Sequence, residues 1–426
     1  MFYNIINSER RTGESATLTD PRKKQPLWAV TVANETDLND AVQAARAAFQ
    51  SWKLLSAVSR QNYLLKLADE VERRRSEIHG PLAGETGKSV SQYYIKRLNI
   101  GQGRDPRCLF MSQDLLANIE IDDMLDFIRF NASQSLPDEV QYEDEKIKIV
   151  STHHPIGVVG AICPWNFPLV LATGKVAAAL VMGNCVIIKP SPFTPCATLK
   201  FVELAMSILP PGVLQALNGN NGIGGLMTTH PGIDKISFTG SSATGKKVAV
   251  SAAQTLKRVT LELGGNDASI ICPDIDVKNV ASKVAAGTFF HSGQMCVATK
   301  RVYVHEAIFL EFRDAFMEAV KSIRIDPSGK QPVLFSPVQN EIQYKIVKDL
   351  IADCREHDYT ILCGDNLDDK YPGLFIAPVV VDQPPDDSRV MQMEQFGPII
   401  PLAKWGSEDE LIARVNGTDT GLGACV

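Results

Sequence analysis

Residues 158–189 read VVGAICPWNFPLVLATGKVAAALVMGNCVIIK, and this stretch decides the fold of the chain. Its only charged residues are Lys175 and the terminal Lys189. A membrane-spanning helix needs about 20 consecutive apolar residues, but prolines, glycines and asparagines interrupt this stretch. We therefore predict a buried strand, a loop, a helix and a second buried strand, because strands of a parallel sheet are covered on both faces.

The same alternation continues to about residue 263. It is typical of an α/β fold with a doubly wound, Rossmann-type parallel sheet. A second α/β region is predicted from about residue 268 to the end. In the first region, strands are predicted at 158–163, 185–189, 213–217, 235–239 and 259–263, with helices near 176–180, 195–209, 223–229 and 243–253.

Local patterns predict three further details. Thr36 is interpreted as the N-cap of a first helix, because threonine caps helices and apolar residues follow at helical spacing. Thr194 is interpreted in the same way as the cap of a helix whose first turn holds Pro195. The alternation around Ile147 and Ile149 is typical of a half-exposed strand.

Length and composition exclude several classes of protein. A chain of 426 residues is expected to form two or three domains. Its net charge of -6 gives no sign of a nucleic acid or an anionic membrane as partner. The nine cysteines are scattered without CxxC pairs, and residues 1–13 contain no apolar secretory core, so we expect a cytoplasmic protein. The seven histidines show no HxH or HExxH spacing, so no metal site is predicted.

The segment HSGQMCVATKR at residues 291–301 is the first candidate for chemistry. It follows a mostly apolar helical run at residues 277–290, and Gly293 is typical of a helix end. Cys296 is therefore expected on the short connection to the next strand, at residues 301–305, where a small substrate can reach its thiol. A catalytic nucleophile and a buried structural cysteine both remain open for this residue.

Two further features are candidates for binding a nucleotide. The glycine turn GSSATG at residues 240–245 follows a strand and opens a helix, where free N–H groups attract a phosphate. A plain strand-to-helix turn is the alternative, and the GxGxxG fingerprint is absent. Lys189 ends a predicted strand, at the edge where ligands bind in open α/β sheets. Its ammonium could bind ribose hydroxyls or phosphates. The alternative is a structural lysine whose side chain extends to the protein surface.

Glu262 and Asn166 are candidates for acid–base and oxyanion chemistry. Glu262 lies in the apolar segment VTLELGG and is expected to be buried, which raises the pKa of a carboxyl toward the range of a general base. A salt-bridged structural carboxylate is the alternative. Asn166 lies in PWNFP, where its amide could donate to an oxyanion, and a turn asparagine is the alternative.

In this order along the chain, PWNFP, KPSPFTP, SFTGSSATG, LELGGN, GQMC and EQFGP resemble the motifs of the aldehyde dehydrogenase superfamily. The resemblance covers nearly the whole chain. It implies an NAD(P)-binding domain of Rossmann type, an α/β catalytic domain and a small bridging hairpin. The implied boundaries are residues 1–138 and 156–264 for the cofactor domain, 139–155 for the bridging and oligomerisation hairpin, and 265–426 for the catalytic domain.

The resemblance also implies a reaction: oxidation of an aldehyde to the acid through a thiohemiacetal and a thioester on Cys296. Asn166 and the N–H of Cys296 would bind the oxyanion, and Glu262 would activate the hydrolytic water. The cofactor would be NAD or NADP. Lys189 and Glu394 would hold its two riboses, and Phe396 would pack near the nicotinamide. The implied cofactor-binding residues are Ile162, Trp165, Lys189, Gly224, Thr239, Gly240, Ser241, Glu394 and Phe396.

Three features depart from the family pattern. Many members that prefer NAD have a glutamate three residues after the lysine, where this chain has Pro192, so both cofactors remain open. Residues 92–115 interrupt helical texture, and we interpret them as an insertion, with a gene-model or splicing artefact as the hypothesis for its origin. The chain stops at GLGACV, so we expect a C-terminally truncated form with a weakened homodimer or tetramer. A catalytically impaired paralogue or fragment that acts only through binding is the alternative function.

Overall fold

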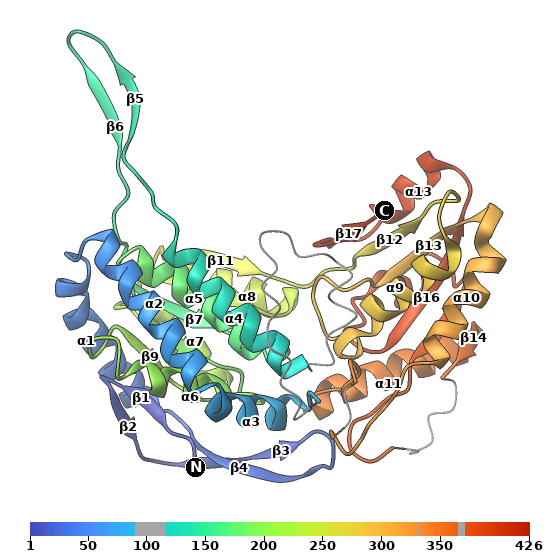
Figure 1. The fold of residues 1–426 in the computed structure, drawn as a ribbon, viewed down its shortest axis with the longest axis horizontal. Helices are drawn as coiled ribbons and strands as arrows, with labels where there is room; N and C mark the ends of the chain where they lie inside the picture. The colour runs from blue at the N-terminus through green and yellow to red at the C-terminus, as the bar shows by residue number, and fades with distance from the viewer. Residues whose placement is uncertain (90–115, 331–332, 365–370) are drawn as a thin grey trace. The chain divides into compact units, whose positions relative to one another are not determined.

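The computed structural model describes residues 1–89, 116–330, 333–364 and 371–426, which form two compact units (Figure 1). Unit 1 consists of Met1–Leu18, Leu27–Leu82 and Ile119–Glu262. Unit 2 consists of the described residues of Thr19–Pro26, Ala83–Asn118 and Leu263–Val426. The predicted insertion at residues 92–115 lies outside the described residues. The functions predicted for the domains stay predictions.

Unit 1 is built on a seven-stranded sheet in the order β11-β10-β7-β8-β9-β1-β2. The five strands from β11 to β9 are parallel, as predicted, while β1 runs antiparallel to its neighbours β9 and β2. The strands are β1 (Asn4–Ile6), β2 (Glu9–Arg11), β7 (Val158–Ile162), β8 (Cys185–Lys189), β9 (Leu214–Ala216), β10 (Lys235–Thr239) and β11 (Arg258–Glu262).

Helices cover both faces of this sheet. The path β7–α5–β8–α6–β9 places α5 and α6 on one face, because crossovers between parallel strands are right-handed. The chain then returns to β10 on the other side of β7, which places α7 and α8 on the opposite face, where α1 packs against α7. The helices are α1 (Glu35–Trp52), α2 (Ala57–Arg73), α3 (Arg75–Thr86), α4 (Leu116–Ala132), α5 (Pro168–Val181), α6 (Cys196–Ala205), α7 (Asn221–Thr229) and α8 (Ser242–Ala253).

The N-cap of α1 is Asn34, so the prediction of Thr36 is wrong. Asn34 Oδ1 accepts the N–H of Asp37 at 3.0 Å, and the Asp37 carboxylate accepts the N–H of Asn34 at 3.0 Å. This reciprocal pair satisfies two backbone donors, which the Thr36 hydroxyl inside the first turn does not do. Thr194 is likewise no cap, because α6 begins at Cys196 after the N-cap residue Pro195.

Unit 2 contains a six-stranded sheet in the order β14-β15-β16-β13-β12-β17. All neighbouring strands are parallel except the pair β14 and β15. The strands are β12 (Ala268–Ile271), β13 (Arg301–His305), β14 (Thr360–Cys363), β15 (Val379–Asp382), β16 (Ile399–Trp405) and β17 (Ala424–Cys425). The helices are α9 (Val277–Phe289), α10 (Phe309–Lys321), α11 (Glu341–Glu356), α12 (Arg389–Gln392) and α13 (Glu408–Val415).

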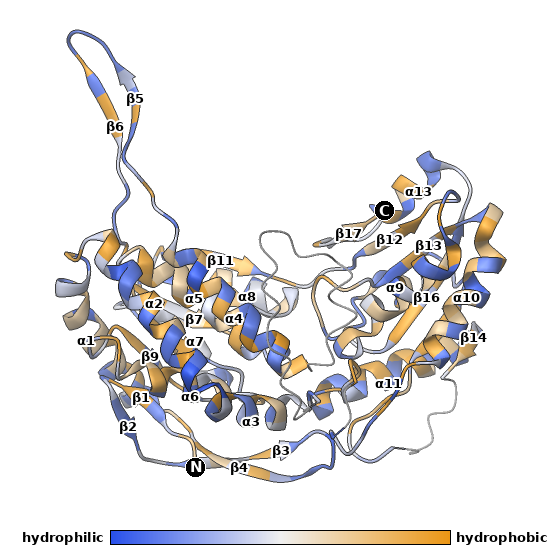
Figure 2. Cartoon of the chain, in the orientation of Figure 1, coloured by the Kyte–Doolittle hydropathy of each residue, from blue (hydrophilic) through white to orange (hydrophobic). Residues whose placement is uncertain are grey.

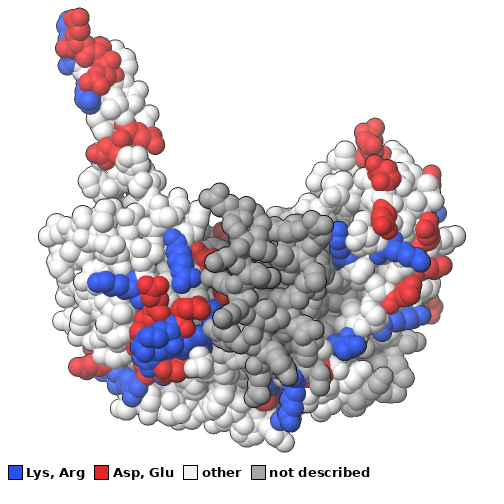
Figure 3. Space-filling view, in the orientation of Figure 1, with Lys and Arg blue, Asp and Glu red and all other residues white. Residues whose placement is uncertain are grey.

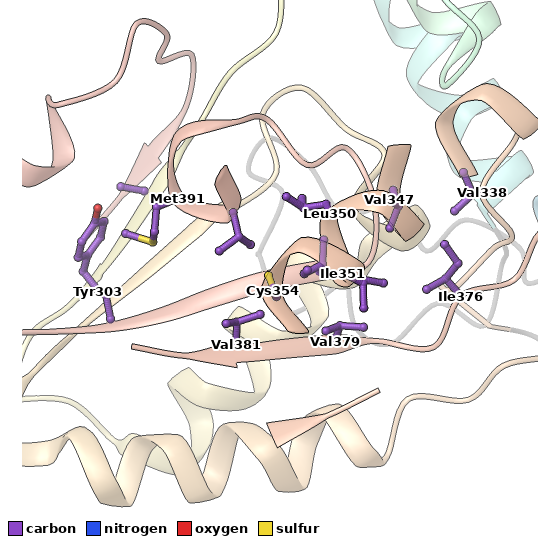
Figure 4. Close-up of a cluster of buried hydrophobic side chains, with 14 of the residues drawn as sticks. Tyr303, Val338, Val347, Leu350, Ile351, Cys354, Ile376, Val379, Val381 and Met391 are labelled. Atoms are coloured by element: carbon purple, nitrogen blue, oxygen red, sulfur yellow. The ribbon is translucent and has the colours of Figure 1, made fainter. Parts of the chain in front are cut away.

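Both faces of the unit 2 sheet are buried under helices. Val379 and Val381 of β15 point to one face, where the apolar stripe of α11 packs against them (Figure 4). That stripe has the helical spacing expected of a buried face: it consists of Val347, Leu350, Ile351 and Cys354. Val380 points to the other face and joins Phe312 and Phe316 of α10. The sheet is therefore covered on two sides, as parallel sheets require.

Two hairpins complete the fold: β3 (Ser15–Asp20) with β4 (Gln25–Thr31), and β5 (Glu139–Glu143) with β6 (Lys148–Ser151). The second hairpin extends away from the rest of unit 1 (Figure 1). Apolar residues occur on both strands (Figure 2). Their side chains are exposed, with Val140 of β5 at 53% and Ile149 of β6 at 52%, and Ile147 just before β6 is 55% exposed. The predicted strand is present as β6, but the prediction that one of its faces is buried is wrong, because both of its faces are exposed. Acidic and basic side chains gather at its tip (Figure 3).

Across the described ranges, no helix combines the length and the apolar character needed to cross a membrane. The apolar stretch at residues 158–189 instead forms β7, α5 and β8, as predicted. Every residue of β7 and β8 is buried.

Asn34→Ala should lower the free energy of unfolding by about 1 kcal/mol, because it removes the acceptor from the capping pair. The matched control is Thr36→Ala, which changes an exposed residue in the first turn of the same helix and should have a smaller effect. Urea unfolding followed by circular dichroism measures both. Equal losses for the two variants would contradict the assignment of Asn34 as the cap.

Candidate active site

The carboxyl ends of β7, β8 and β10 lie at one edge of the unit 1 sheet. The strand order reverses at β7, because β8 and β9 follow on one side of it and β10 and β11 on the other. Ligands of open α/β sheets bind at such a switch point, beyond the carboxyl ends of the strands. Ile162, Lys189 and Thr239 are the last residues of these three strands. Unit 1 therefore brings three of the predicted cofactor residues to the expected edge.

Lys189 lies at this edge with a buried ammonium group. Its Nζ donates to the carbonyl oxygen of Pro190 at 3.2 Å. Burial lowers the pKa of Lys189 to about 8, although the nearby thiol of Cys163 raises it. A Cβ at Gly224 would lie 3.5 Å from Cδ and Cε of Lys189, so this glycine of α7 covers the methylene groups of the lysine. The structure thus brings Lys189 and Gly224 together.

The turn from β10 to α8 contains Thr239, Gly240 and Ser241. Thr239 accepts a hydrogen bond from Nζ of Lys175, a residue of α5 that the sequence interpretation did not assign to the site. A Cβ at Gly240 would lie 2.6 Å from Cζ of Phe238, so a side chain does not fit there. Ser241 is the N-cap of α8, and its Oγ accepts the N–H of Thr244 at 3.3 Å. A helix start with the positive end of its dipole fits the diphosphate of a dinucleotide.

The loop after β7 holds Trp165 and Asn166, and Asn166 is 3% exposed. Pro168 ends this loop as the first residue of α5. The carboxylate of Glu120 accepts the N–H of Leu169 at 2.8 Å and therefore caps the start of α5 from α4. Sequence reasoning missed Glu120, because it comes from a helix distant in the chain. The cap fixes the end of the loop that carries Asn166.

Glu262 is exposed, so the prediction that it is buried is wrong. It is the last residue of β11, and β11 is the edge strand of the sheet, which leaves one side of the strand without a neighbour. Its charge raises the pKa of Lys175, whereas burial lowers that pKa, and burial has the larger effect. Glu262, Lys175 and Thr239 thus belong to one group of polar side chains, and Thr239 is paired with Glu262 in the sheet.

In unit 2, Cys296 lies on the connection between α9 and β13, as predicted. A short helical turn follows α9, and three successive residues adopt positive φ: His291 (49°), Ser292 (56°) and Gly293 (71°). A Cβ at Gly293 would lie 2.5 Å from the carbonyl oxygen of Gly397. Only glycine allows this approach, which places the cysteine loop against the segment EQFGP at residues 394–398.

Buried polar side chains hold the cysteine loop, residues 291–300, against residues 336–339. His291 Nδ1 and Ser336 Oγ are 2.7 Å apart. Gln294 Nε2 donates to the carbonyl oxygens of His291 at 2.9 Å and Pro337 at 3.0 Å, and Gln294 Oε1 accepts the N–H of Gln339 at 2.8 Å. Because these groups are buried and bonded to each other, the loop has one well-defined conformation.

The environment of the Cys296 thiol both disfavours and favours its thiolate. On balance the pKa of Cys296 lies above its ordinary value: burial raises it most, and the charge of Glu394 raises it further. The charge of Lys300 and the N–H groups of Val297 and Cys296 lower the pKa. The side chain is half-buried, so the sulfur lies at the surface of the loop and not in the core.

Glu394 and Phe396 lie on the segment next to this loop. Glu394 Oε1 accepts the N–H of Gly265 at 3.2 Å, and a Cβ at Gly264 would lie 1.9 Å from Oε2. Burial raises the pKa of Glu394, and the charge of Lys300 lowers it. Phe396 has a φ of 46°, and its carbonyl oxygen accepts Nε2 of Gln343 at 3.2 Å. Unit 2 therefore brings Cys296 and Glu394 together around Lys300.

Within the part of the chain that the structure describes, no three His, Cys, Asp or Glu side chains are placed to hold a metal ion. Asn166 and Glu262 belong to unit 1 and Cys296 belongs to unit 2. Their predicted catalytic roles stay predictions.

The model of the aldehyde dehydrogenase family matches residues 8–99 and 113–426. The internal residues that the model does not match, 100–112, fall inside the stretch predicted as an insertion, which itself stays a prediction. The chain is 40% identical over 426 residues to the putative aldehyde dehydrogenase FUS7 of Gibberella fujikuroi. That match covers 100% of this chain and 85% of the relative.

Solved structures with this fold include proteins that use either nicotinamide cofactor. The NAD+ complex of an aldehyde dehydrogenase from Bacillus cereus has a TM-score of 0.89 and 28% identity, and the match covers 99% of this chain and 83% of that one. An NADP-dependent enzyme of E. coli has a TM-score of 0.89 and 28% identity, with coverages of 99% and 84%.

These matches span nearly the whole chain and agree with the α/β fold described above. They support NAD or NADP as the cofactor, and both remain open. The chain belongs to the aldehyde dehydrogenase family, whose members oxidise aldehydes with NAD+ or NADP+.

Proposed function

We propose that this enzyme oxidises its aldehyde through a covalent intermediate on Cys296, with Glu262 as the general base and Asn166 as an oxyanion donor. The observation that carries the proposal is the setting of Cys296: a half-buried thiol on a rigid loop, beside two backbone N–H groups and a buried ammonium. The ammonium and the N–H groups oppose the burial that raises the pKa of this thiol, and a thiol reacts as its thiolate.

In the first step, the thiolate sulfur of Cys296 attacks the carbonyl carbon of the aldehyde. A carbon–sulfur bond forms, and the π electrons of the carbonyl move to its oxygen, which gives a thiohemiacetal anion. The amide of Asn166 and the N–H of Cys296 donate to this oxygen. Such donors stabilise charge that develops in the transition state, and removal of one typically slows turnover by roughly a hundredfold or more.

NAD+ or NADP+, when bound, would supply the acceptor for the hydride of the thiohemiacetal carbon, and the thioester would stay on Cys296. We propose that Lys189 and Gly224 hold its adenosine end and that the turn Thr239–Ser241 holds its diphosphate. Glu394 and Phe396 position its nicotinamide end, and Ile162 and Trp165 line the site. Support comes from the buried ammonium of Lys189 and the helix start at Ser241.

In the last step, Glu262 accepts a proton from a water molecule, and the water oxygen attacks the acyl carbon of the thioester. The carbon–sulfur bond breaks, the sulfur leaves as a thiolate, and the carboxylic acid is released. The exposed position of Glu262 supports this role, because water reaches its carboxylate directly.

We also propose that the hairpin of β5 and β6 mediates self-association. A two-stranded hairpin with apolar residues exposed on both strands leaves edges and faces that favour pairing with another sheet. The exposed apolar residues of the hairpin are Val140, Tyr142, Ile147, Ile149 and Val150.

We propose a reducing compartment, the cytoplasm, as the location of the protein. All cysteines in the described residues are free thiols, including the exposed Cys425. Structural disulfides are rare in reducing compartments.

Cys296→Ala should lower dehydrogenase activity by at least roughly a thousandfold, because no nucleophile remains to form the thiohemiacetal. Activity is measured as absorbance of the reduced cofactor with a panel of aldehydes. The matched control is Cys272→Ala, which removes another partly buried thiol of unit 2 and should retain activity. Normal turnover by Cys296→Ala would refute the proposed function.

Glu262→Gln should permit thioester formation but block its hydrolysis, because the amide does not accept the proton of the water. Rapid mixing should then show one burst of reduced cofactor per site followed by a steady rate roughly a hundredfold or more below the wild type. Mass spectrometry of the quenched protein should find the acyl group on Cys296. A variant with a wild-type steady rate would exclude Glu262 as the base.

The affinity for the cofactor should fall as the pH rises through about 8, the pKa of Lys189. Below this pH the ammonium is charged and attracts the nucleotide, and above it the charge is lost. The dissociation constant should rise by roughly tenfold between about pH 7 and pH 9, because only about a tenth of the protein then carries the charge. Fluorescence titration measures this change. Lys189→Met should bind weakly with no such dependence, and a wild-type affinity that is constant over this range would contradict the prediction.

A further inference from the structure

Lys300 is a buried lysine four residues after Cys296, and the reaction described above does not use it. The side chains of Lys300 and Asp267 are each 3% exposed, and Lys300 Nζ lies 3.7 Å from a carboxylate oxygen of Asp267. The ammonium donates to three carbonyl oxygens of the cysteine loop: those of Met295 (2.8 Å), Cys296 (3.1 Å) and Ala298 (2.8 Å). A buried ammonium with this many acceptors is strongly held in one position.

These hydrogen bonds determine the orientation of two peptide groups. The carbonyl of Met295 and the N–H of Cys296 belong to one planar peptide group, and the carbonyl of Cys296 and the N–H of Val297 belong to the next. In a trans peptide the N–H points opposite to the C=O. Because both carbonyls point to Lys300 Nζ, both N–H groups point away from it. These are the N–H groups that act on the Cys296 sulfur and lower its pKa.

The backbone of Lys300 is fixed as firmly as its side chain. Its N–H donates to the carbonyl oxygen of Asp267 at 2.8 Å, and its carbonyl oxygen accepts Nε2 of Gln395 at 3.1 Å. Asp267 is held in turn, because one carboxylate oxygen accepts the N–H groups of Leu422 at 2.9 Å and Gly423 at 2.6 Å. The ammonium therefore cannot follow a movement of the loop, and it holds the loop in place.

We propose that Lys300 is a positioning residue for Cys296: its ammonium turns the N–H groups of Cys296 and Val297 toward the sulfur, and its charge stabilises the thiolate. This inference rests on the proposed role of Cys296 as the nucleophile. The N–H of Cys296 is also the backbone donor proposed for the oxyanion, so the same three hydrogen bonds prepare both the attacking sulfur and the site that receives the negative oxygen.

Two carboxylates near this sulfur also affect the ionisation of Cys296 and of Lys300. Glu394, on the segment before β16, raises the pKa of the Cys296 thiol through its negative charge. Asp267, on the loop before β12, acts on Lys300 and not directly on the thiol. Burial lowers the pKa of Lys300, while Glu394 and Asp267 raise it, so the two carboxylates help the ammonium keep its proton.

The experiment measures the reactivity of Cys296 directly and does not depend on turnover. The purified full chain is treated with iodoacetamide between about pH 6 and pH 10, and alkylation of the peptide that contains Cys296 is followed by mass spectrometry, because only the thiolate reacts. The variants are Lys300→Gln, whose amide keeps donors but no charge, Lys300→Met, which keeps neither, and Lys300→Arg, which keeps the charge.

Loss of the charge should raise the midpoint of the Cys296 profile by roughly one pH unit, so that alkylation below the midpoint is roughly tenfold slower in Lys300→Gln and Lys300→Met. Lys300→Arg should stay near the wild type. The matched control is Lys257→Met, because Lys257 also donates to loop carbonyls, those of His230 and of Ile233 at 2.9 Å, but in unit 1. Its Cys296 profile should not change.

A folded Lys300→Gln protein with the wild-type midpoint would overturn the proposal, and so would an equal shift in Lys257→Met. Should Lys300→Met fail to fold by circular dichroism, Lys300→Gln and Lys300→Arg decide the outcome, because a structural role alone predicts no difference in midpoint between them. The two proposals fail through different results. Normal turnover by Cys296→Ala would refute the proposed function, whereas an unchanged alkylation midpoint in Lys300→Gln would refute only the role of Lys300.

Discussion

Complete burial of β7 and β8 is the constraint on which the arrangement of unit 1 depends. Helices cover both faces of these strands, so their interior positions hold only apolar side chains and glycine. A polar side chain can therefore enter only where a strand ends. Lys189 occupies such an end, and its buried ammonium is acceptable because the Pro190 carbonyl receives it. The chemistry of unit 1 is confined to one edge by the same burial that stabilises the sheet.

Unit 2 reaches a comparable result with close backbone contacts. Glycine at 293 allows the cysteine loop to approach the carbonyl of Gly397, and glycine at 264 leaves room for the carboxylate of Glu394. A side chain at 293 would push the loop away from the backbone of Gly397, and a side chain at 264 would displace the carboxylate of Glu394. The glycines in GQMC and LELGGN are thus explained by packing. These glycines let Cys296, Lys300 and Glu394 lie close together, and packing alone accounts for them.

Much of unit 1 was predictable because its signals are local. The alternation of short apolar runs with helical spacing places β7, α5 and β8 correctly, and it places Cys296 between α9 and β13. The exposure of Glu262 was not predictable, since it depends on which strand lies at the edge of the sheet. The role of Asn34 was missed because threonine two residues later is also a favoured capping residue by type. The contacts of Lys300 depend on the orientation of carbonyl groups, about which residue identity carries no information.

The edge position of β11 has a consequence for the movement of protons. A carboxylate at the open end of an edge strand exchanges protons with bulk solvent directly. In the proposed mechanism, the proton that Glu262 takes up at each hydrolysis can therefore leave without a chain of buried carriers. Bulk water and buffer molecules would deprotonate Glu262 between catalytic cycles, and no series of proton-transferring side chains would be needed.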